Sequence, residues 1–144
     1  MNYYSIVILA FIFLESANVL ALYFNPGTRN FNGVGVFKAW ESSKAHPDIH
    51  DFVIYLVYWV AGTKLIFILL LLVILFSASD NTKLLAAVAL VVAISSFFWR
   101  LFPLIRKMDR AGQIEPSNYS VVLGLMILGF IIIFLAAILS TLLF

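Results

Sequence analysis

Three ionisable side chains lie inside long apolar stretches of the chain, where a charge is energetically unfavourable. Glu15 lies in the middle of the first stretch, Lys64 in the middle of the second, and Arg100 near the end of the third. Each such group costs about 2.5–3.5 kcal/mol or more at the centre of a bilayer. A carboxylate and an ammonium group at similar depth either neutralise one another or line a polar site that binds a solute or relays a proton.

The spacing of Glu15 and Lys64 allows the two side chains to meet. Glu15 is 9 residues from Phe24, where the first stretch ends, and Lys64 is 12 residues from Phe52, where the second begins. At about 1.5 Å of rise per residue, their depths differ by about 5 Å, which a lysine side chain can span. Asn18 lies on the same helix face as Glu15, one turn further on. A structural ion pair and a polar functional site both fit this spacing.

Ser96 and Arg100 extend the predicted polar region into the third stretch. They end a stripe of small residues at helical spacing, which permits close approach of helices. Arg100 either extends outward to the membrane boundary or reaches towards Glu15 and Asn18 to form a positive pocket. Pro103 predicts a kink one turn before it. The predicted solute path or buried polar network comprises Glu15, Asn18, Lys64, Ser96 and Arg100.

The two histidines lie close together at the predicted membrane boundary, in the segment from His46 to Asp51. Pro47 separates them and disfavours a regular helical metal site, so we predict no metal. An enzyme acting at the interface would use His50, Asp51 and Arg100, with Trp40 at the same boundary. The sequence contains no cysteine, no Gly-rich phosphate loop and no HExxH motif. We therefore predict no cofactor and assign no catalytic residue.

Composition indicates which elements must position these residues. Apolar residues make up 64% of the 144 residues and charged residues 11%, which excludes a soluble enzyme, a disordered chain and a nucleic-acid-binding module. Each apolar run has at least the ~20 residues that a helix needs to cross a bilayer. We predict an all-α integral membrane four-helix bundle, one transmembrane domain over residues 1–144, with spans at about 3–24, 52–77, 84–105 and 119–144.

We predict a short helix within the long first loop, residues 25–51. Around Trp40, apolar residues and charged residues each recur at the spacing of an amphipathic helix. We expect a short amphipathic helix at the membrane interface, ended by Pro47, with Asp48 capping the second span. Such a helix acts as a lid, docks a partner, or simply connects two spans while resting on lipid headgroups.

The distribution of basic residues predicts the orientation. Loops 25–51 and 106–118 together carry six Lys and Arg residues, whereas the loop between the second and third spans carries only Lys83. The positive-inside rule places the two basic loops in the cytoplasm and both termini outside. The expected location is the plasma (inner) membrane.

Three functions fit these features. The first is an oligomeric transporter or channel for an ion or small molecule, with a polar site around Glu15 and Lys64, because four thin helices enclose little volume alone. The second is an accessory or structural membrane subunit in which Glu15 and Lys64 form a structural pair. The third, a lipid-binding or lipid-modifying enzyme at the cytoplasmic interface, is the least favoured. The expected partners are the lipid bilayer and either a second copy of the chain or a membrane subunit, with no nucleic acid.

Overall fold

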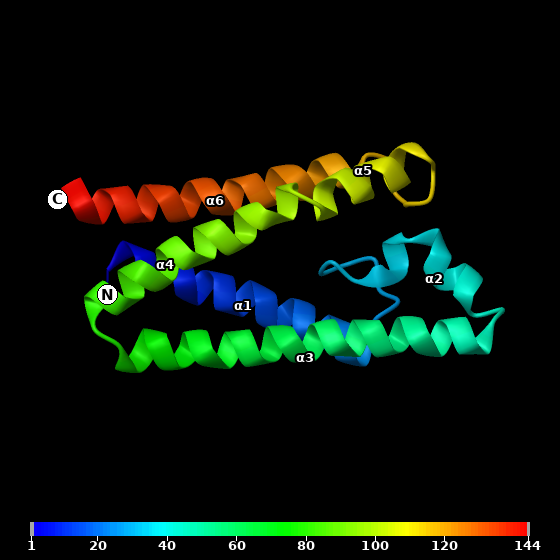
Figure 1. Cartoon of the computed structure of the whole chain (residues 1–144), viewed down its shortest axis with the longest axis horizontal. Coiled ribbons are helices and arrows are strands. Elements are labelled where there is room, and N and C mark those ends of the chain that lie inside the picture. Colours follow the sequence, from blue (N-terminus) through cyan, green and yellow to red (C-terminus); the bar gives the residue numbers. More distant parts are fainter. Residues whose placement is uncertain (1, 144) are drawn as a thin grey trace.

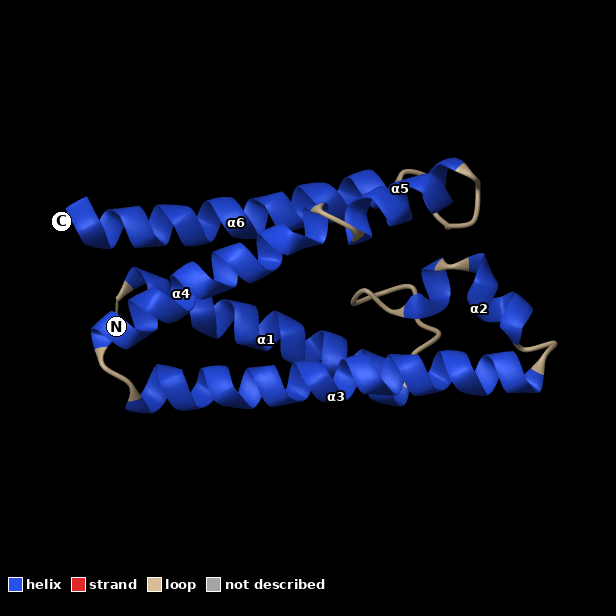
Figure 2. Cartoon of the chain, viewed as in Figure 1, coloured by secondary structure: helices blue, strands red, loops and turns tan. Residues whose placement is uncertain are grey.

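The computed structural model describes residues 2–143, apart from the side chain of Leu142, and this part of the chain is all-α without strands (Figures 1 and 2). Four helical stretches are long and apolar enough to cross a membrane: α1, α3, α4 through α5, and α6. This confirms the predicted all-helical class with four long apolar helices. The elements in chain order are α1 (Tyr3–Phe24), η1 (Val34–Val36), α2 (Lys38–Ser43), α3 (Pro47–Ser77), α4 (Asp80–Ser95), η2 (Ser96–Phe98), α5 (Leu101–Arg110) and α6 (Tyr119–Leu143).

α3 begins earlier, and α5 ends later, than the sequence indicated. α3 begins at Pro47 rather than near Phe52, because proline fits the first helical position, where its missing N–H is not needed. His46 is the N-cap residue, so Asp48 does not cap this helix as expected. Asp48 lies instead in the first turn, where its charge suits the helix dipole. α5 continues to Arg110 through a segment expected to be loop, and basic residues in its last turn suit the dipole there.

The third apolar stretch is interrupted. α4 ends at Ser95, η2 follows, and α5 begins at Leu101, with Arg100 between them at φ −121° and ψ −40°. Pro103 has no N–H to donate to the carbonyl group of residue 99, one turn earlier. The helix is therefore broken at and just before the turn where a kink was expected.

One apolar core joins all four long helices at the end of the molecule that holds both termini and the turn between α3 and α4, called the terminal end below (Figure 1). Ile8 and Phe11 of α1 lie at its centre, against Phe134 of α6. Ile68 contributes from α3 and Leu90 from α4. Burial of these side chains stabilises the helix arrangement at this end.

Towards the opposite, loop end the core divides into two separate clusters. One joins α1 to α3 through Leu22, Val57 and Ala61. The other joins α5, α6 and the connecting loops, with Ile105 and Leu123 among its members. The molecule consequently has two arms at this end, an α1–α3 arm and an α5–α6 arm, which diverge in Figure 1.

The loops connect the two arms at the loop end. α2 provides the short helix expected in the first loop, although it ends at Ser43 rather than at Pro47. The backbone N–H of Lys38 donates to the carbonyl oxygen of Gln113 over 2.9 Å, and that of Glu115 donates to Val36 over 2.8 Å. This bridge ties the first loop to the loop between α5 and α6.

Candidate functional site

Lys64 joins Glu15 and Asn18 in a single polar contact between α1 and α3. The Nζ atom lies 2.7 Å from Oε2 of Glu15 and 2.7 Å from Oδ1 of Asn18. Glu15 and Asn18 face α3 together because they are three residues apart on α1. The structure thus brings together three of the five residues that the sequence analysis placed in a polar path or network.

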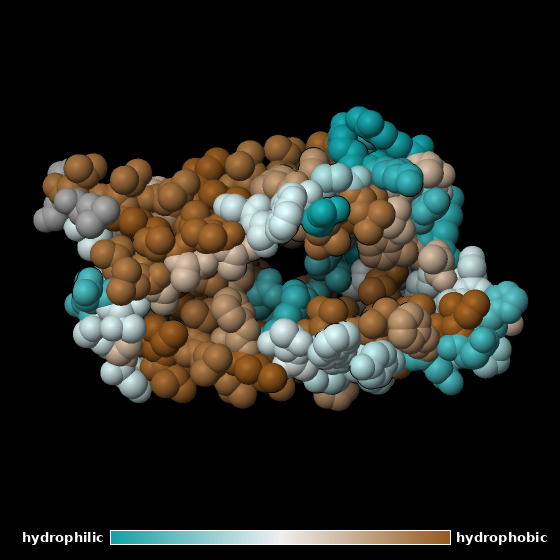
Figure 3. All heavy atoms as spheres, in the orientation of Figure 1, coloured by the Kyte–Doolittle hydropathy of each residue, from teal (hydrophilic) through white to brown (hydrophobic). Residues whose placement is uncertain are grey.

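This polar site lies where the apolar core divides. On α3, Lys64 lies between Ala61, which belongs to the α1–α3 cluster, and Ile68, which belongs to the common core. The side chains of Lys64 and Glu15 are 29% and 26% exposed, whereas Asn18 is buried. Figure 3 shows a hollow between the two arms with hydrophilic surface along part of its rim. The ion pair is therefore half-buried rather than fully enclosed.

Residues 25–33, called the inserted loop below, turn back between the two arms and reach the polar site (Figure 2). The Nδ2 atom of Asn18 donates to the carbonyl oxygens of Phe31 and of Asn32, the latter over 3.4 Å. Because both amide hydrogens point to the loop, the amide oxygen of Asn18 is left to face Lys64. One side chain therefore links the ion pair to the loop backbone.

The backbone of the inserted loop reverses direction at its tip. Phe31 and Asn32 adopt left-handed conformations, with φ of 51° and 57°. These are unusual for residues other than glycine, and asparagine tolerates them better than phenylalanine does. At the base of the loop, the N–H of Val34 donates to the carbonyl oxygen of Pro26 over 2.9 Å. The closed base and the reversed tip direct the two carbonyl oxygens at Asn18.

Two glycines allow the loop to close. A Cβ atom at Gly35 would overlap the carbonyl group of Gly27, and one at Gly27 would overlap the indole ring of Trp40. Trp40 is buried and covers the base of the loop. Neither glycine has room for a side chain, so the base of the loop packs tightly against its own backbone and against Trp40.

The polar contacts continue from the inserted loop to α6. The hydroxyl group of Tyr119 donates to Oδ1 of Asn32 over 2.6 Å. Contacts therefore run from Lys64 on α3, through Asn18 on α1 and the loop, to α6 on the other arm. The sequence analysis missed Phe31, Asn32 and Tyr119 because two act through backbone carbonyl groups, which leave no side-chain signal. Asn-Pro-Gly at positions 25–27 indicated only a sharp turn.

Exposed ion pairs lie on the outer side of the loops. Glu115 pairs with Arg29 at 3.1 Å and with Lys38 at 3.5 Å. All three side chains are about half exposed, so each pair contributes at most about 1 kcal/mol. These pairs add little to the backbone bridge that already joins the two loops.

Ser96 and Arg100 do not contact the polar site. The hydroxyl group of Ser96 donates to the carbonyl oxygen of Ala93 over 2.6 Å. The guanidinium group of Arg100 lies 5.5 Å from the centre of the Trp99 ring, and its side chain is exposed. Both residues mark the interruption between α4 and α5.

Two of the three predicted interface residues, Trp40 and His50, hold α2 against α3. Nδ1 of His50 lies 2.8 Å from the hydroxyl oxygen of Ser43, whose hydrogen is donated to the carbonyl oxygen of Trp40. His50 is therefore assigned the tautomer in which Nδ1 carries the hydrogen. Its ring lies 4.8 Å from the Trp40 ring, whereas Asp51 is exposed and unpaired within residues 2–143. Across that same range, no three His, Cys, Asp or Glu residues are grouped to hold a metal ion.

Asp109 fixes the start of α6 and thereby the position of Tyr119. Its carboxylate accepts the backbone N–H of Asn118 over 3.1 Å and that of Ser120 over 2.9 Å. The Ser120 hydroxyl group donates to the same carboxylate over 2.5 Å. The sequence analysis assigned Asp109 only to a basic loop, because a cap that comes from another helix has no local spacing signal.

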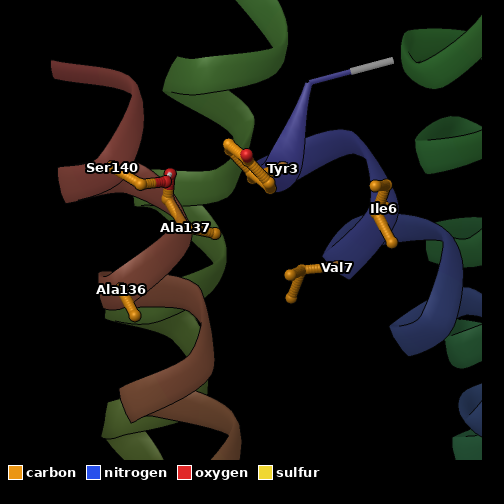
Figure 4. A pocket seen from close by; sticks show the side chains of 6 residues that line it. All are labelled: Tyr3, Ile6, Val7, Ala136, Ala137 and Ser140. Carbon is orange, nitrogen blue, oxygen red and sulfur yellow. Dashed lines mark hydrogen bonds between the residues drawn. The ribbon is translucent and has the colours of Figure 1, made fainter. Parts of the chain in front are cut away.

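A cavity of about 490 Å³ lies at the terminal end between α1 and α6 (Figure 4). It is lined by Tyr3, Ile6, Val7, Ala136, Ala137 and Ser140. None of these side chains is charged, and the Ser140 hydroxyl group already donates to the carbonyl oxygen of Ala137. The cavity is mostly apolar, and its polar side-chain groups are the hydroxyl groups of Tyr3 and Ser140.

The polar site can bind more than it now holds. One carboxylate oxygen of Glu15 and one N–H of Lys64 have no partner among the residues that the structure describes, and both side chains are partly accessible. An ion or a small polar molecule that reaches the ion pair could use both. Comparison of the chain with protein-family models, curated proteins and solved structures finds no match.

Proposed function

We propose that this chain crosses a membrane four times and acts, as a homo-oligomer, as a transporter or channel for an ion or small molecule. The polar site around Glu15 and Lys64 binds the solute. In the proposed orientation, the loop end lies in the cytoplasm and both termini lie outside, following the positive-inside rule. The proposed location is the plasma (inner) membrane.

The observation that carries the proposal is the partly exposed ion pair midway along two membrane-length helices. Charges at such a depth mark solute or proton pathways when they face a cavity, because they are unfavourable against lipid. Glu15 and Lys64 each retain hydrogen-bonding capacity for a ligand.

The inserted loop closes the site towards the loop end in this proposal. It is held there by Asn18, which also binds Lys64. A solute that draws Lys64 away from Asn18 alters the same side chain that anchors the loop. Solute binding and movement of the loop are therefore coupled through Asn18.

A second candidate, an accessory or structural membrane subunit, is favoured by one specific observation. Every buried side-chain nitrogen and oxygen atom in the described part of the chain has a hydrogen-bond partner. Polar networks satisfied in this way also fix the register of packed helices. A structural pair predicts a different response to mutation, which the same experiment measures.

The test is solute flux in proteoliposomes containing the purified full-length chain. Stopped-flow light scattering reports entry of salts and small neutral solutes from a panel of probes. The transport proposal predicts that Glu15→Gln reduces flux at least tenfold while the protein retains its helical circular dichroism and its elution volume. The matched control is Glu41→Gln, because that carboxylate is exposed on α2 and pairs only with Lys44; it should leave flux unchanged.

Two outcomes would contradict transport. One is a wild-type chain that passes no probe in the panel. The other is a Glu15→Gln protein that fails to fold and is restored by adding Lys64→Met, which would show that the pair serves the structure alone.

A further inference from the structure

We propose that the polar site takes a small monovalent anion on Lys64 together with a proton on Glu15. This inference rests on the proposed function and names the class of solute. It follows from how the hydrogen bonds of the ion pair are divided and from the charge that the apolar surroundings tolerate.

The two partners of the ion pair are held unequally. Lys64 donates to both Glu15 and Asn18, whereas Glu15 accepts from Lys64 alone among residues 2–143. Asn18 is fixed in turn by the inserted loop. Separation of the pair leaves Lys64 with one fixed partner and leaves Glu15 with none. Glu15 is therefore the group that must be neutralised when the pair opens.

Charge balance then limits which charged solutes the site can take. With Glu15 ionised and Lys64 protonated, the site has no net charge. A lone cation on Glu15 would make the site positive, and a lone anion on Lys64 would make it negative, both at a high desolvation cost. If a proton binds Glu15, its bond from Lys64 is lost, Lys64 turns its free N–H groups to the anion, and the neutral carboxyl group donates to the same anion. The charges are then 0, +1 and −1, which sum to zero.

The other charges in the structure lie away from the ion pair. Arg100, the third charge inside the predicted spans, is exposed and does not contact the polar site. Asp48 and Asp51 lie near the start of α3, and Asp80 and Lys83 of α4 lie at the terminal end. Among residues 2–143, the structure shows no hydrogen bond or ion pair between any of these groups and Glu15, so Lys64 is the charged group that contacts it.

The experiment measures anion-driven proton entry into proteoliposomes with pyranine trapped inside. Chloride and nitrate, as potassium salts, are the probes, and potassium with valinomycin sets the membrane potential. The wild-type chain should carry one proton with each anion, at a rate that does not depend on the potential. Lys64→Met should reduce anion and proton entry at least tenfold. Glu15→Gln should also reduce anion and proton entry at least tenfold, because no carboxylate then remains to replace the departing anion on Lys64, whereas its fold should be retained.

The control variant is Lys83→Met, which removes a partly buried cation that pairs with Asp80 outside the site, and it should leave both fluxes unchanged. Entry of chloride or nitrate without protons in the wild type would overturn the inference. So would selection of sodium or potassium over the anions. If another solute of the flux panel crosses in a Glu15-dependent manner, this inference fails and the proposed function stands; if no solute crosses, both fail.

Discussion

The ion pair between Glu15 and Lys64 should show a large energetic coupling in a double-mutant cycle. The variants are Glu15→Gln, Lys64→Met and the double substitution. Either single change leaves one charged or polar partner without its counterpart in low-dielectric surroundings. The double change removes both charges, so it should cost little more than either single change.

The structure sets the expected size of this coupling between two limits. Breaking a fully buried pair costs about 3–5 kcal/mol, whereas exposed pairs contribute about 0.2–1 kcal/mol. Glu15 and Lys64 are 26% and 29% exposed and lie 2.7 Å apart. We expect a coupling of about 2 kcal/mol, which is about 30-fold in the unfolding equilibrium constant. Each single variant should lose about 2.5 kcal/mol and the double variant about 3 kcal/mol.

The assay is reversible unfolding in mixed detergent micelles with increasing dodecyl sulfate, followed by the fluorescence of the three tryptophans. The matched control cycle uses Glu41 and Lys44, whose atoms lie 2.8 Å apart but on an exposed surface. Its coupling should stay below about 1 kcal/mol. Equal couplings in the two cycles would refute the reasoning, because burial at the division of the core would then add nothing to the pair.

Three further predictions concern the cap, the loop and the orientation. Asp109→Ala removes the cap of α6 and should lower the unfolding free energy in the same assay; an unchanged value would contradict the capping role. Gly35→Ala should displace the inserted loop and speed its proteolysis several-fold, whereas Gly129→Ala, which meets no neighbouring atom, should not. Since the chain has no cysteine, a single introduced cysteine reports on which side of the membrane it lies. A membrane-impermeant maleimide should label the Asn81→Cys variant on intact cells, but the Ser42→Cys variant only after permeabilisation. The reverse pattern of labelling would overturn the proposed orientation.

The long apolar helices could be predicted because their signal is local. Length and hydropathy identified them, and matching depth on consecutive helices anticipated the contact of Glu15 with Lys64. Helix ends were less predictable where capping came from elsewhere. Pro47 began α3 rather than ending the preceding loop helix, and α5 ran on to Arg110. These ends depend on the competition between capping, dipole and packing.

The inserted loop could not be predicted because its contacts are made by backbone groups between distant segments. Phe31 and Asn32 are unremarkable residue types for a polar loop, and only their left-handed conformations direct the carbonyl groups at Asn18. Tyr119 resembles any interfacial aromatic residue at the start of a span. Its contact with Asn32 requires α6 to be fixed by Asp109, a residue on another helix.

The position of the charges bears on the choice between structure and transport. Apolar residues of similar volume hold packed helices at least as well as a buried ion pair does, and often better. Here the ion pair lies where the common core ends and the arms diverge, and the loop that reaches it is held in left-handed conformations. A pair that served only to fix α1 against α3 would not need a half-exposed position or a link to a loop. A pair that must open for a solute needs both, since exposure admits the solute and the link through Asn18 transmits the opening to the loop.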